Sequence, residues 1–454
     1  MRVLSLFVLI AVLAAPATGQ LLPPVGGLGP VGGGALRPLD PLLVPTAAPM
    51  LGGPMLGGPI GISGLVDAGA IPAARALADL RRERLRQLVR SNRDVLEADP
   101  QDNPVRRGEL LALDLPAAAL AQLTAQGFAV VRREGGGAGG GGAGGGGAGG
   151  GGAGEVTILR PPAKLKLEKA LAALRAAAPG IVADYNHVYE PAGAALQAAP
   201  GAAMIAASAG STGNASIGMI DGGVAAHPAL AGARIEQRGF AGAVKATGHG
   251  TAVASLLVGD AAGFRGAARG ARLLVADVYG GAAGNGSAQA IAQALDWLGG
   301  RGAQVINISL VGPPNLLMAR SIAAIQAKGI VVVAAVGNDG PAAPPMYPAS
   351  YPQVVAVTAV DAKARPLIEA GRAVHTDFAA PGADMAAALI GGGYTPVRGT
   401  SFAAPLVAAR LAAHPARPLV AVAAEARATG NKRIGMGIVC ETCRNDPRLL
   451  REKK

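Results

Sequence analysis

The chain has 454 residues, a net charge of +12, 69 glycines and 34 prolines. Half of the residues are hydrophobic and only 3% are aromatic, so a large core can form but must consist of Ala, Val, Leu and Ile. The basic residues are scattered and are not interleaved with aromatic side chains, which argues against a nucleic-acid-binding protein. The densest basic stretch, RRERLRQLVR at 81–90, has leucines near helical spacing and indicates a solvated helix face.

The first 19 residues have the features of a secretory signal peptide. Arg2 precedes the apolar stretch VLSLFVLIAVLAA, and the small residues APATG follow it. A transmembrane anchor is the alternative, but the apolar stretch is shorter than the ~20 residues that span a bilayer. We therefore expect export to the periplasm or the medium and no membrane span.

Residues 20–72 are rich in proline and glycine without a period and predict a flexible segment. A helix is predicted over 73–98. Residues 108–134 then predict a strand, a helix and a strand, and residues 155–190 predict the same order again. The stretch 135–154 between them, with a five-residue period of Gly and Ala, has no side chains to pack.

The order strand-helix-strand twice is that of the ferredoxin-like split βαβ fold. We expect residues 73–190 to form one small α+β domain whose middle strands are joined by the long glycine-rich loop. A glycine-rich loop of this length destabilises the domain only slightly, since each doubling of loop length costs only about 0.6 kcal/mol. Two unrelated halves joined by a linker are the alternative.

Residues 191–212 are small and unpatterned and predict an exposed linker. From 213 to 443, continuous apolar strands alternate with helices, which predicts a doubly wound, mainly parallel α/β sheet covered on both faces. Residues 444–454 form a basic tail. The predicted strands are 215–221, 271–279, 303–310, 329–337 and 353–360, and the predicted helices between them are 249–258, 286–299 and 314–328.

Four polar residues stand at strand ends or helix starts of this predicted sheet. Asp221 ends a strand, His249 and Ser401 open helices, and Asn338 follows a strand. Each has a local explanation as a turn or cap residue. Together they match a nucleophilic site, because a serine hydroxyl needs a histidine to take its proton and the histidine needs a carboxylate to orient it.

Six motifs resemble, in order, those of the subtilisin-like serine proteases: IDGGV, GHGTAVASLLVG, INISLVGP, AAVGNDG, YPASYPQVVAVTAVD and GTSFAAP. The resemblance covers roughly residues 213–440. It implies that Asp221 is the orienting acid, His249 the general base, Ser401 the nucleophile and Asn338 a donor of the oxyanion hole. It further implies a substrate-binding role for two segments, Ser309, Leu310, Val311 and Gly312, and Ala334, Ala335, Val336 and Gly337.

By the same resemblance, the chain is a secreted serine endopeptidase made as a zymogen and acting on protein or peptide substrates. Residues 73–190 are then an inhibitory propeptide, with processing within 191–214. We expect a monomer that needs no cofactor; calcium is compatible with the family, but no ligands can be assigned. The alternative is a catalytically inactive, exported peptide-binding protein.

The sequence departs from the family pattern at two positions. Gly222 follows the predicted catalytic aspartate where the family usually has Ser or Thr, and Val311 stands where Gly is more common. We expect Val311 to narrow the substrate cleft.

The chain has only two cysteines, Cys440 and Cys443. In an oxidising compartment, a short-loop disulfide between them is the first expectation. A zinc site would need two further ligands, and the nearest histidine, His414, lies well upstream.

Overall fold

The computed structural model describes residues 70–135, 154–192, 213, 215–282 and 284–445. The predicted signal peptide, nearly all of the Pro/Gly-rich segment, the glycine-rich stretch, most of the predicted linker and the end of the basic tail lie outside the described residues. No helix in the described ranges is long and apolar enough to cross a membrane.

The larger part of the described chain, the α/β domain of residues 215–443, is built on a parallel sheet. This seven-stranded sheet has the order β16-β15-β14-β12-β7-β11-β8, and every neighbouring pair is parallel. Its strands are β7 (Ser216–Asp221), β8 (Arg234–Gly239), β11 (Arg272–Asp277), β12 (Val305–Ile308), β14 (Val331–Ala335), β15 (Val355–Val360) and β16 (Phe378–Pro381). Strands β8 and β16 were not predicted; they lie at the two edges of the sheet, β8 with a mostly polar sequence and β16 with only four residues.

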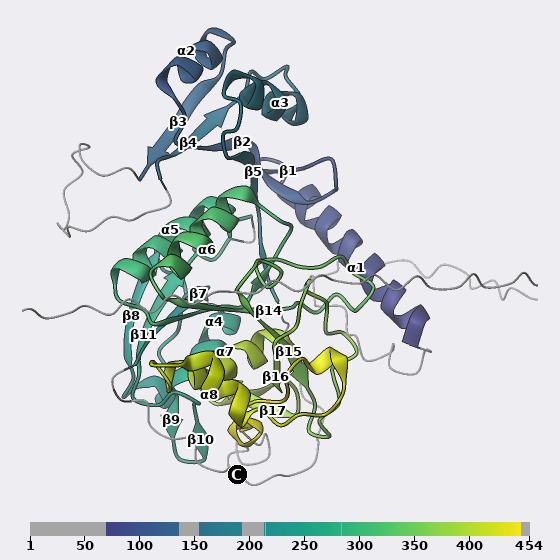
Figure 1. Ribbon diagram of the computed structural model, residues 1–454, viewed down its shortest axis with the longest axis vertical. Coiled ribbons are helices and arrows are strands. Elements are labelled where there is room, and N and C mark those ends of the chain that lie inside the picture. Colours follow the sequence, from purple (N-terminus) through teal and green to yellow (C-terminus); the bar gives the residue numbers. More distant parts are fainter. Residues whose placement is uncertain (1–69, 136–153, 193–212, 214, 283, 446–454) are drawn as a thin grey trace, which may run out of the picture. The chain divides into compact units, whose positions relative to one another are not determined.

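Helices cover both faces of this sheet. Helices α5 (Ala288–Gly300) and α6 (Leu316–Ala327) lie side by side over one face (Figure 1), where they pack on Ile220 and Ile306. Helices α4 (Gly248–Val258) and α7 (Thr400–Ala412) pack on the other face, and α8 (Pro418–Glu425) packs on α7. The predicted doubly wound α/β fold is thus confirmed.

Short strand pairs complete the α/β domain. Strand β9 (Asp260–Ala261) pairs with β10 (Phe264–Arg265), and β17 (Met385–Ala388) pairs with β18 (Tyr394–Val397). A further pair, antiparallel, joins β6 (Glu190–Pro191) to β13 (Leu310–Val311). This last pair links residues before the predicted processing segment to the α/β domain.

The smaller domain, residues 96–187, has an antiparallel sheet with two helices on one face. Its strands are β1 (Leu96–Ala98), β2 (Pro104–Leu113), β3 (Ala129–Glu134), β4 (Val156–Arg160) and β5 (Ala183–His187), and its helices are α2 (Ala117–Ala125) and α3 (Leu167–Ala177). Strand β2 lies between β5 and β4, and β3 pairs with β4 on its other side, which is the arrangement of the split βαβ fold. Because β3 and β4 are paired, the glycine-rich stretch connects neighbouring strands of one sheet.

The helix predicted over 73–98 is wrong at its end. Helix α1 (Ala70–Ser91) stops at Ser91, and residues 96–98 form β1 against the start of β2. The side chain of Asn92 donates to the carbonyl of Leu88, and Leu96 is fully buried. Tertiary burial of Leu96 therefore overrides the continuing helical pattern. Helix α3 begins at Leu167, after a turn in which the Leu165 N–H donates to the Pro162 carbonyl.

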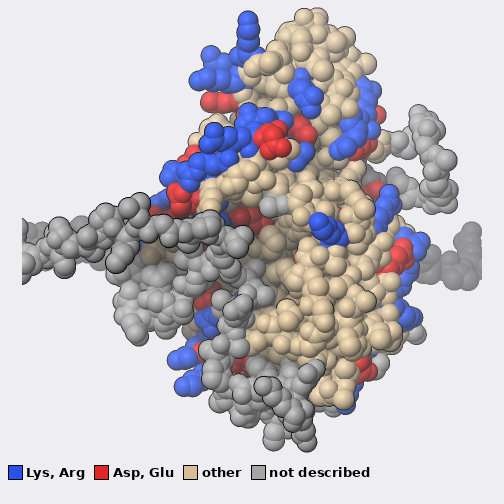
Figure 2. Space-filling view, turned by 180° about the vertical axis from the view of Figure 1, so that it is seen from behind, with Lys and Arg blue, Asp and Glu red and all other residues tan. Residues whose placement is uncertain are grey.

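Charged side chains of both signs share the surface. In the space-filling view, Lys and Arg side chains are interspersed with Asp and Glu side chains (Figure 2). Ion pairs among them include Arg410–Glu425 and Arg427–Glu441. This mixture is unlike the single-sign surface that phosphate backbones require.

Strand β5 meets the N-terminus of α6 through buried polar groups. The carboxylate of Asp184 accepts from the backbone N–H of Leu316 at 2.8 Å, a favourable position for an anion because helix N-termini are electropositive. His187 Nε2 lies 3.1 Å from Asp99 Oδ2, and its Nδ1 lies 2.9 Å from the amide of Asn315. Asp99 also accepts from the backbone of Gln101 and from Asn103.

These contacts lower the pKa of Asp99. Burial alone would raise its pKa, but the hydrogen bonds from His187, Asn103 and Gln101 outweigh burial and lower the pKa below its ordinary value. A carboxyl with a lowered folded-state pKa stabilises the fold above its unfolded pKa of about 4, and this contribution is lost as the pH falls through the folded value.

We predict that Asp99→Asn in a Ser401→Ala background lowers the free energy of unfolding of the small domain at pH 7 by about 1–3 kcal/mol. The difference between variant and parent should shrink below about pH 4, where Asp99 of the parent becomes protonated. Thermal unfolding monitored between pH 3 and pH 7 measures both effects. Asp102→Asn is the matched control, since Asp102 makes an exposed ion pair with Arg86; an equal loss in both variants would contradict the prediction.

Candidate active site

A carboxylate and an imidazole meet at the carboxyl end of β7. Asp221, the last residue of β7, is 1% exposed, and its two oxygens lie 2.9 and 2.8 Å from His249 Nδ1. Its Oδ1 also accepts from the backbone N–H of Gly222 at 2.7 Å. His249 stands in the first turn of α4, whose N-cap is Thr247. The carboxylate thus fixes Nδ1 and leaves Nε2 for chemistry.

Gly222 is explained by the N-cap of the next helix. The Thr247 hydroxyl accepts from the Gly250 N–H at 3.0 Å, and a Cβ at position 222 would lie 2.3 Å from that hydroxyl oxygen. A side chain at 222 and the cap at Thr247 therefore compete for one space. The departure from the family pattern at Gly222 is a local exchange, in which the threonine hydroxyl occupies the volume that a Ser or Thr side chain would take.

Ser401 lies in the first turn of α7, next to His249. It is fully buried, and the ring of the following residue, Phe402, lies 5.5 Å from the imidazole ring, centroid to centroid. Ser401 Oγ donates to the backbone carbonyl of Ser309 at 3.4 Å. Within the described part of the chain, His249 Nε2 is buried and has no hydrogen-bond partner. The structure therefore brings Asp221 and His249 into contact, with Ser401 close by but hydrogen-bonded elsewhere.

The carbonyl of Ser401 is freed by a proline in α7. Pro405 has no N–H, so it cannot bond to the carbonyl four residues before it. The hydroxyl of Ser309 takes that place and donates to the Ser401 carbonyl at 3.0 Å, while it accepts from the amide of Asn307. Residues at the end of β12 thus hold the first turn of α7.

Asn338 binds the same turn from the end of β14. Its side-chain oxygen accepts from the backbone N–H of Thr400 at 2.9 Å, and the Thr400 hydroxyl accepts from the N–H of Gly337 at 3.1 Å. Gly399 has a φ of 137°, and a Cβ there would lie 2.9 Å from the Asn338 amide nitrogen. The Asn338 side chain thus bonds to the helix through its oxygen only, and its NH2 group bonds to another partner.

That partner is the chain itself. The Asn338 amide donates to the carbonyl of Ala192, and the N–H of Ala192 donates to the carbonyl of Ser309 at 2.9 Å. Before it, Pro191 and Glu190 lie opposite Leu310 and Val311 in the antiparallel β6–β13 pair. An extended segment thus adds a strand beside residues 309–311, which is the main-chain mode of peptide recognition.

The two predicted substrate-binding segments differ in their surroundings. Residues 309–312 contact the extended segment, and Val311 is 4% exposed. A Cβ at Gly337 would lie 3.3 Å from Val311 Cγ1, so these two residues approach each other and leave little room between them. Ala334, Ala335 and Val336 are fully buried in the two cores of the sheet, so they supply support as well as backbone.

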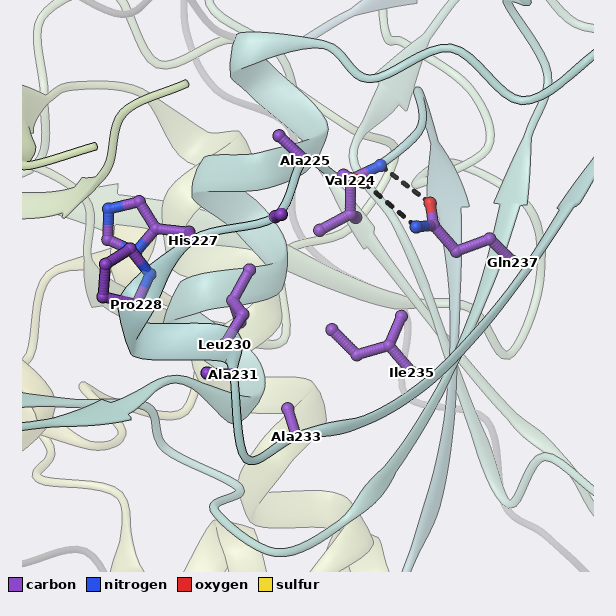
Figure 3. A pocket seen from close by; sticks show the side chains of 10 residues that line it. Val224, Ala225, His227, Pro228, Leu230, Ala231, Ala233, Ile235 and Gln237 are labelled. Atoms are coloured by element: carbon purple, nitrogen blue, oxygen red, sulfur yellow. Dashed lines mark hydrogen bonds between the residues drawn. The ribbon is translucent and has the colours of Figure 1, made fainter. Parts of the chain in front are cut away.

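A separate cavity of about 560 Å³ lies between the loop after β7 and β8 (Figure 3). Its walls are mostly apolar, with Leu230 and Ile235 facing it and Gln237 bonded to the backbone of Val224. It contains none of the predicted site residues.

A disulfide joins Cys440 and Cys443. No cluster of three or more Cys, His, Asp or Glu side chains that could hold a metal ion occurs in the described ranges.

Comparison with known proteins identifies the family of this chain. The model of the subtilase family (Peptidase_S8) matches residues 212–418. Subtilisin Savinase of Lederbergia lenta is 34% identical over 197 residues, which are 42% of this chain and 72% of that protein. The chain belongs to the subtilase family. It is a serine-type endopeptidase, which is the activity that the resemblance of its motifs predicted.

Other relatives extend the likeness. The alkaline protease of Alkalihalobacillus alcalophilus is also 34% identical over 197 residues, and this chain covers 51% of its length. Among solved structures, fervidolysin from Fervidobacterium pennivorans, described as a keratinolytic enzyme related to subtilisin, superposes with a TM-score of 0.60 at 20% identity. That match covers 77% of this chain and 62% of fervidolysin and shows a shared fold.

The subtilase motifs led directly to Asp221, His249, Asn338 and Ser401, but three features lay beyond them. These are the cap at Thr247, the hydroxyl of Ser309 on the Ser401 carbonyl, and the extended segment that includes Ala192. The run of small residues after Pro191 was a signal for the last of these, although not for its position in the cleft.

We predict that Gly222→Ala lowers kcat/KM by at least about tenfold, because the new Cβ displaces Thr247 and with it the first turn that holds His249. The double variant Gly222→Ala/Thr247→Gly should recover part of the loss, since removal of the threonine side chain clears the space. Steady-state kinetics of the wild type, both single variants and the double variant test this. Additive losses in the double variant would contradict the shared-space explanation.

Proposed function

We propose that this subtilase is synthesised as an exported zymogen that cleaves its own chain after Ala192. In this proposal, Ser401 is the nucleophile, His249 the general base, Asp221 the orienting acid and Asn338 an oxyanion donor. Residues 1–19 direct export, and the chain from about residue 73 to Ala192 is the inhibitory pro-segment. The observation that carries the proposal is the hydrogen bond from the Asn338 amide to the Ala192 carbonyl.

The main-chain contacts support Ala192 as the residue before the scissile bond. Its carbonyl oxygen meets the amide proposed to stabilise an oxyanion, and its N–H is held by Ser309. The Ser309 carbonyl also accepts from Ser401 Oγ at 3.4 Å, so the proposed nucleophile and the Ala192 backbone share one acceptor. The bond to be cut is therefore the one between Ala192 and Gly193.

The chemistry follows from these positions. On rotation of its side chain, Ser401 Oγ gives its proton to His249 Nε2 and attacks the Ala192 carbonyl carbon. The carbonyl oxygen becomes an oxyanion, which the Asn338 amide and the backbone N–H of Ser401 stabilise; one such donor contributes about 3 kcal/mol. His249 then protonates the Gly193 nitrogen as the C–N bond breaks, and water releases the acyl group from Ser401 by the reverse proton path.

The side chains of the segment indicate what the cleft accepts. Ala192 is small, in keeping with the close approach of Val311 and Gly337. Tyr189 is fully buried; its hydroxyl donates to the Pro313 carbonyl at 2.8 Å, and a Cβ at Gly312 would lie 2.5 Å from its ring. Substrates with an aromatic residue three positions before a small residue at the cut fit these contacts.

One prediction of the proposed function concerns the self-cleavage reaction. Secreted wild-type protein should begin at Gly193 on N-terminal sequencing and should react with a fluorophosphonate probe, while Ser401→Ala should keep the uncut chain and remain unlabelled. Wild-type protein that is neither cut nor labelled would favour the inactive peptide-binding alternative. A new N-terminus elsewhere between 191 and 214, with labelling intact, would contradict only the assignment of Ala192.

The second prediction concerns Tyr189. Tyr189→Ala should slow self-cleavage by at least about tenfold, because it removes a fully buried aromatic ring from its pocket beside Gly312. Tyr189→Phe, which keeps the ring and loses only the bond to Pro313, is the matched control and should process at close to the wild-type rate. A time course of uncut and cut chain on gels measures both; equal rates for Ala and wild type would contradict the role of Tyr189.

A further inference from the structure

A buried carboxylate lies directly beside the proposed oxyanion donor. Asp339 follows Asn338 in the chain, and its side chain is 6% exposed. Two guanidinium groups contact it: Arg81 Nε lies 3.1 Å from Oδ2, and an Arg84 terminal nitrogen lies 3.1 Å from Oδ1. Both arginines belong to α1 and stand three residues apart, hence on one face of that helix.

Arg81 differs from its neighbours on α1. The Arg81 side chain is only 11% exposed, whereas Arg82 and Arg86, which pair with Asp79 and Asp102, are 58% and 52% exposed. A buried guanidinium needs a compensating charge, and Asp339 supplies it. Helix α1 therefore inserts Arg81 beside the cleft instead of presenting it to solvent.

Arg84 joins Asp339 to the segment in the cleft. Its guanidinium contacts the Glu190 carboxylate at 3.3 and 3.2 Å in addition to Asp339. Burial alone would lower the pKa of Arg84, but the two carboxylates outweigh burial and raise it above its ordinary value. The Arg84 guanidinium thus bridges the carboxylates of Glu190 and Asp339, which are close enough together to contact the same group.

In the described residues, the charged partners of Asp339 both come from α1. Nearby Glu369, by contrast, is paired with Arg398 of the α/β domain itself, at 2.7 Å. If the chain is cut after Ala192 and the pro-segment leaves, Glu369 keeps its partner and Asp339 loses both. A carboxylate left unpaired beside a peptide cleft attracts a cation.

We propose that Asp339 is a binding site for a cationic substrate side chain, and that the processed enzyme prefers Arg or Lys at the position Glu190 occupies in the pro-segment. In the precursor, Arg84 neutralises the mismatch between Glu190 and Asp339. In the processed enzyme, a substrate Arg or Lys at that position reaches Asp339 directly, because it extends farther than Glu and carries the charge that Arg84 supplied. A substrate glutamate there, without Arg84, faces a like charge.

This inference rests on the proposed function and is tested on the processed wild-type enzyme. Three peptides of the form Tyr-X-Pro-Ala with a chromogenic leaving group, where X is Arg, Gln or Glu, serve as substrates. We expect kcat/KM in the order Arg, Gln, Glu, with Arg exceeding Glu by at least about tenfold at low salt and by less at high salt. Cleavage of all three at equal rates would overturn the inference while leaving the proposed function intact; cleavage of none would contradict the proposed function.

The variant Asp339→Asn assigns the preference to this carboxylate. The ratio of kcat/KM for the Arg and Glu peptides should fall to within about twofold, whatever the change in overall rate, because a ratio cancels general effects on catalysis. Asp296→Asn is the matched control, since Asp296 is 65% exposed and contacts only Lys328 at 3.9 Å among the ion pairs. A ratio that survives in Asp339→Asn, or that collapses equally in the control, would overturn the assignment.

A second test uses the full chain and does not depend on the stability of the Asp339 variant. Arg84→Ala should slow self-cleavage several-fold, because Glu190 then loses its cation and faces Asp339, which keeps only Arg81. Adding Glu190→Gln should restore the rate, and Arg82→Ala should process like the wild type. Wild-type processing by Arg84→Ala, or no rescue by Glu190→Gln, would contradict the bridging role of Arg84.

Discussion

The first turn of α7 is held from two neighbouring strands of the parallel sheet, and the active site depends on this attachment. Ser309, just past β12, donates to the Ser401 carbonyl that Pro405 leaves without a helical partner. Asn338, just past β14, accepts from the Thr400 N–H. Since both strands are parallel and adjacent, their carboxyl ends present these groups on one edge, against the electropositive start of a buried helix.

The same groups serve the peptide in the cleft. Asn338 uses its oxygen for the helix and its NH2 group for the Ala192 carbonyl, while the Ser309 carbonyl takes the Ala192 N–H. Rigid support and substrate contact are thus divided between different atoms of the same two residues. A change at either Ser309 or Asn338 would therefore disturb the nucleophile and the bound segment together.

The chain before Ala192 makes charged as well as main-chain contacts with the α/β domain. The small sheet places Asp184 at the N-terminus of α6, and α1 places Arg81 and Arg84 on Asp339. The latter pair is unusual in that the buried carboxylate belongs to the α/β domain and the compensating charge to α1. On the proposed function, processing therefore changes the charge balance of the cleft, and the same carboxylate that helps to hold the pro-segment then selects among substrates.

The sequence by itself determined the elements whose signals are local. Continuous apolar strands between helices predicted the α/β sheet, the repeated strand-helix-strand order predicted the small domain, and the motifs around Asp221, His249, Asn338 and Ser401 indicated the candidate site residues. Only the tertiary structure decided where β1 replaces the end of a predicted helix, that Thr247 fills the space beside Gly222, and that Ala192, Arg84 and Asp339 meet at the cleft. The physical reason is range: periodicity and capping are set by neighbours within a few residues, whereas burial, the volume shared by two side chains and the pairing of distant charges depend on which segments the fold brings together.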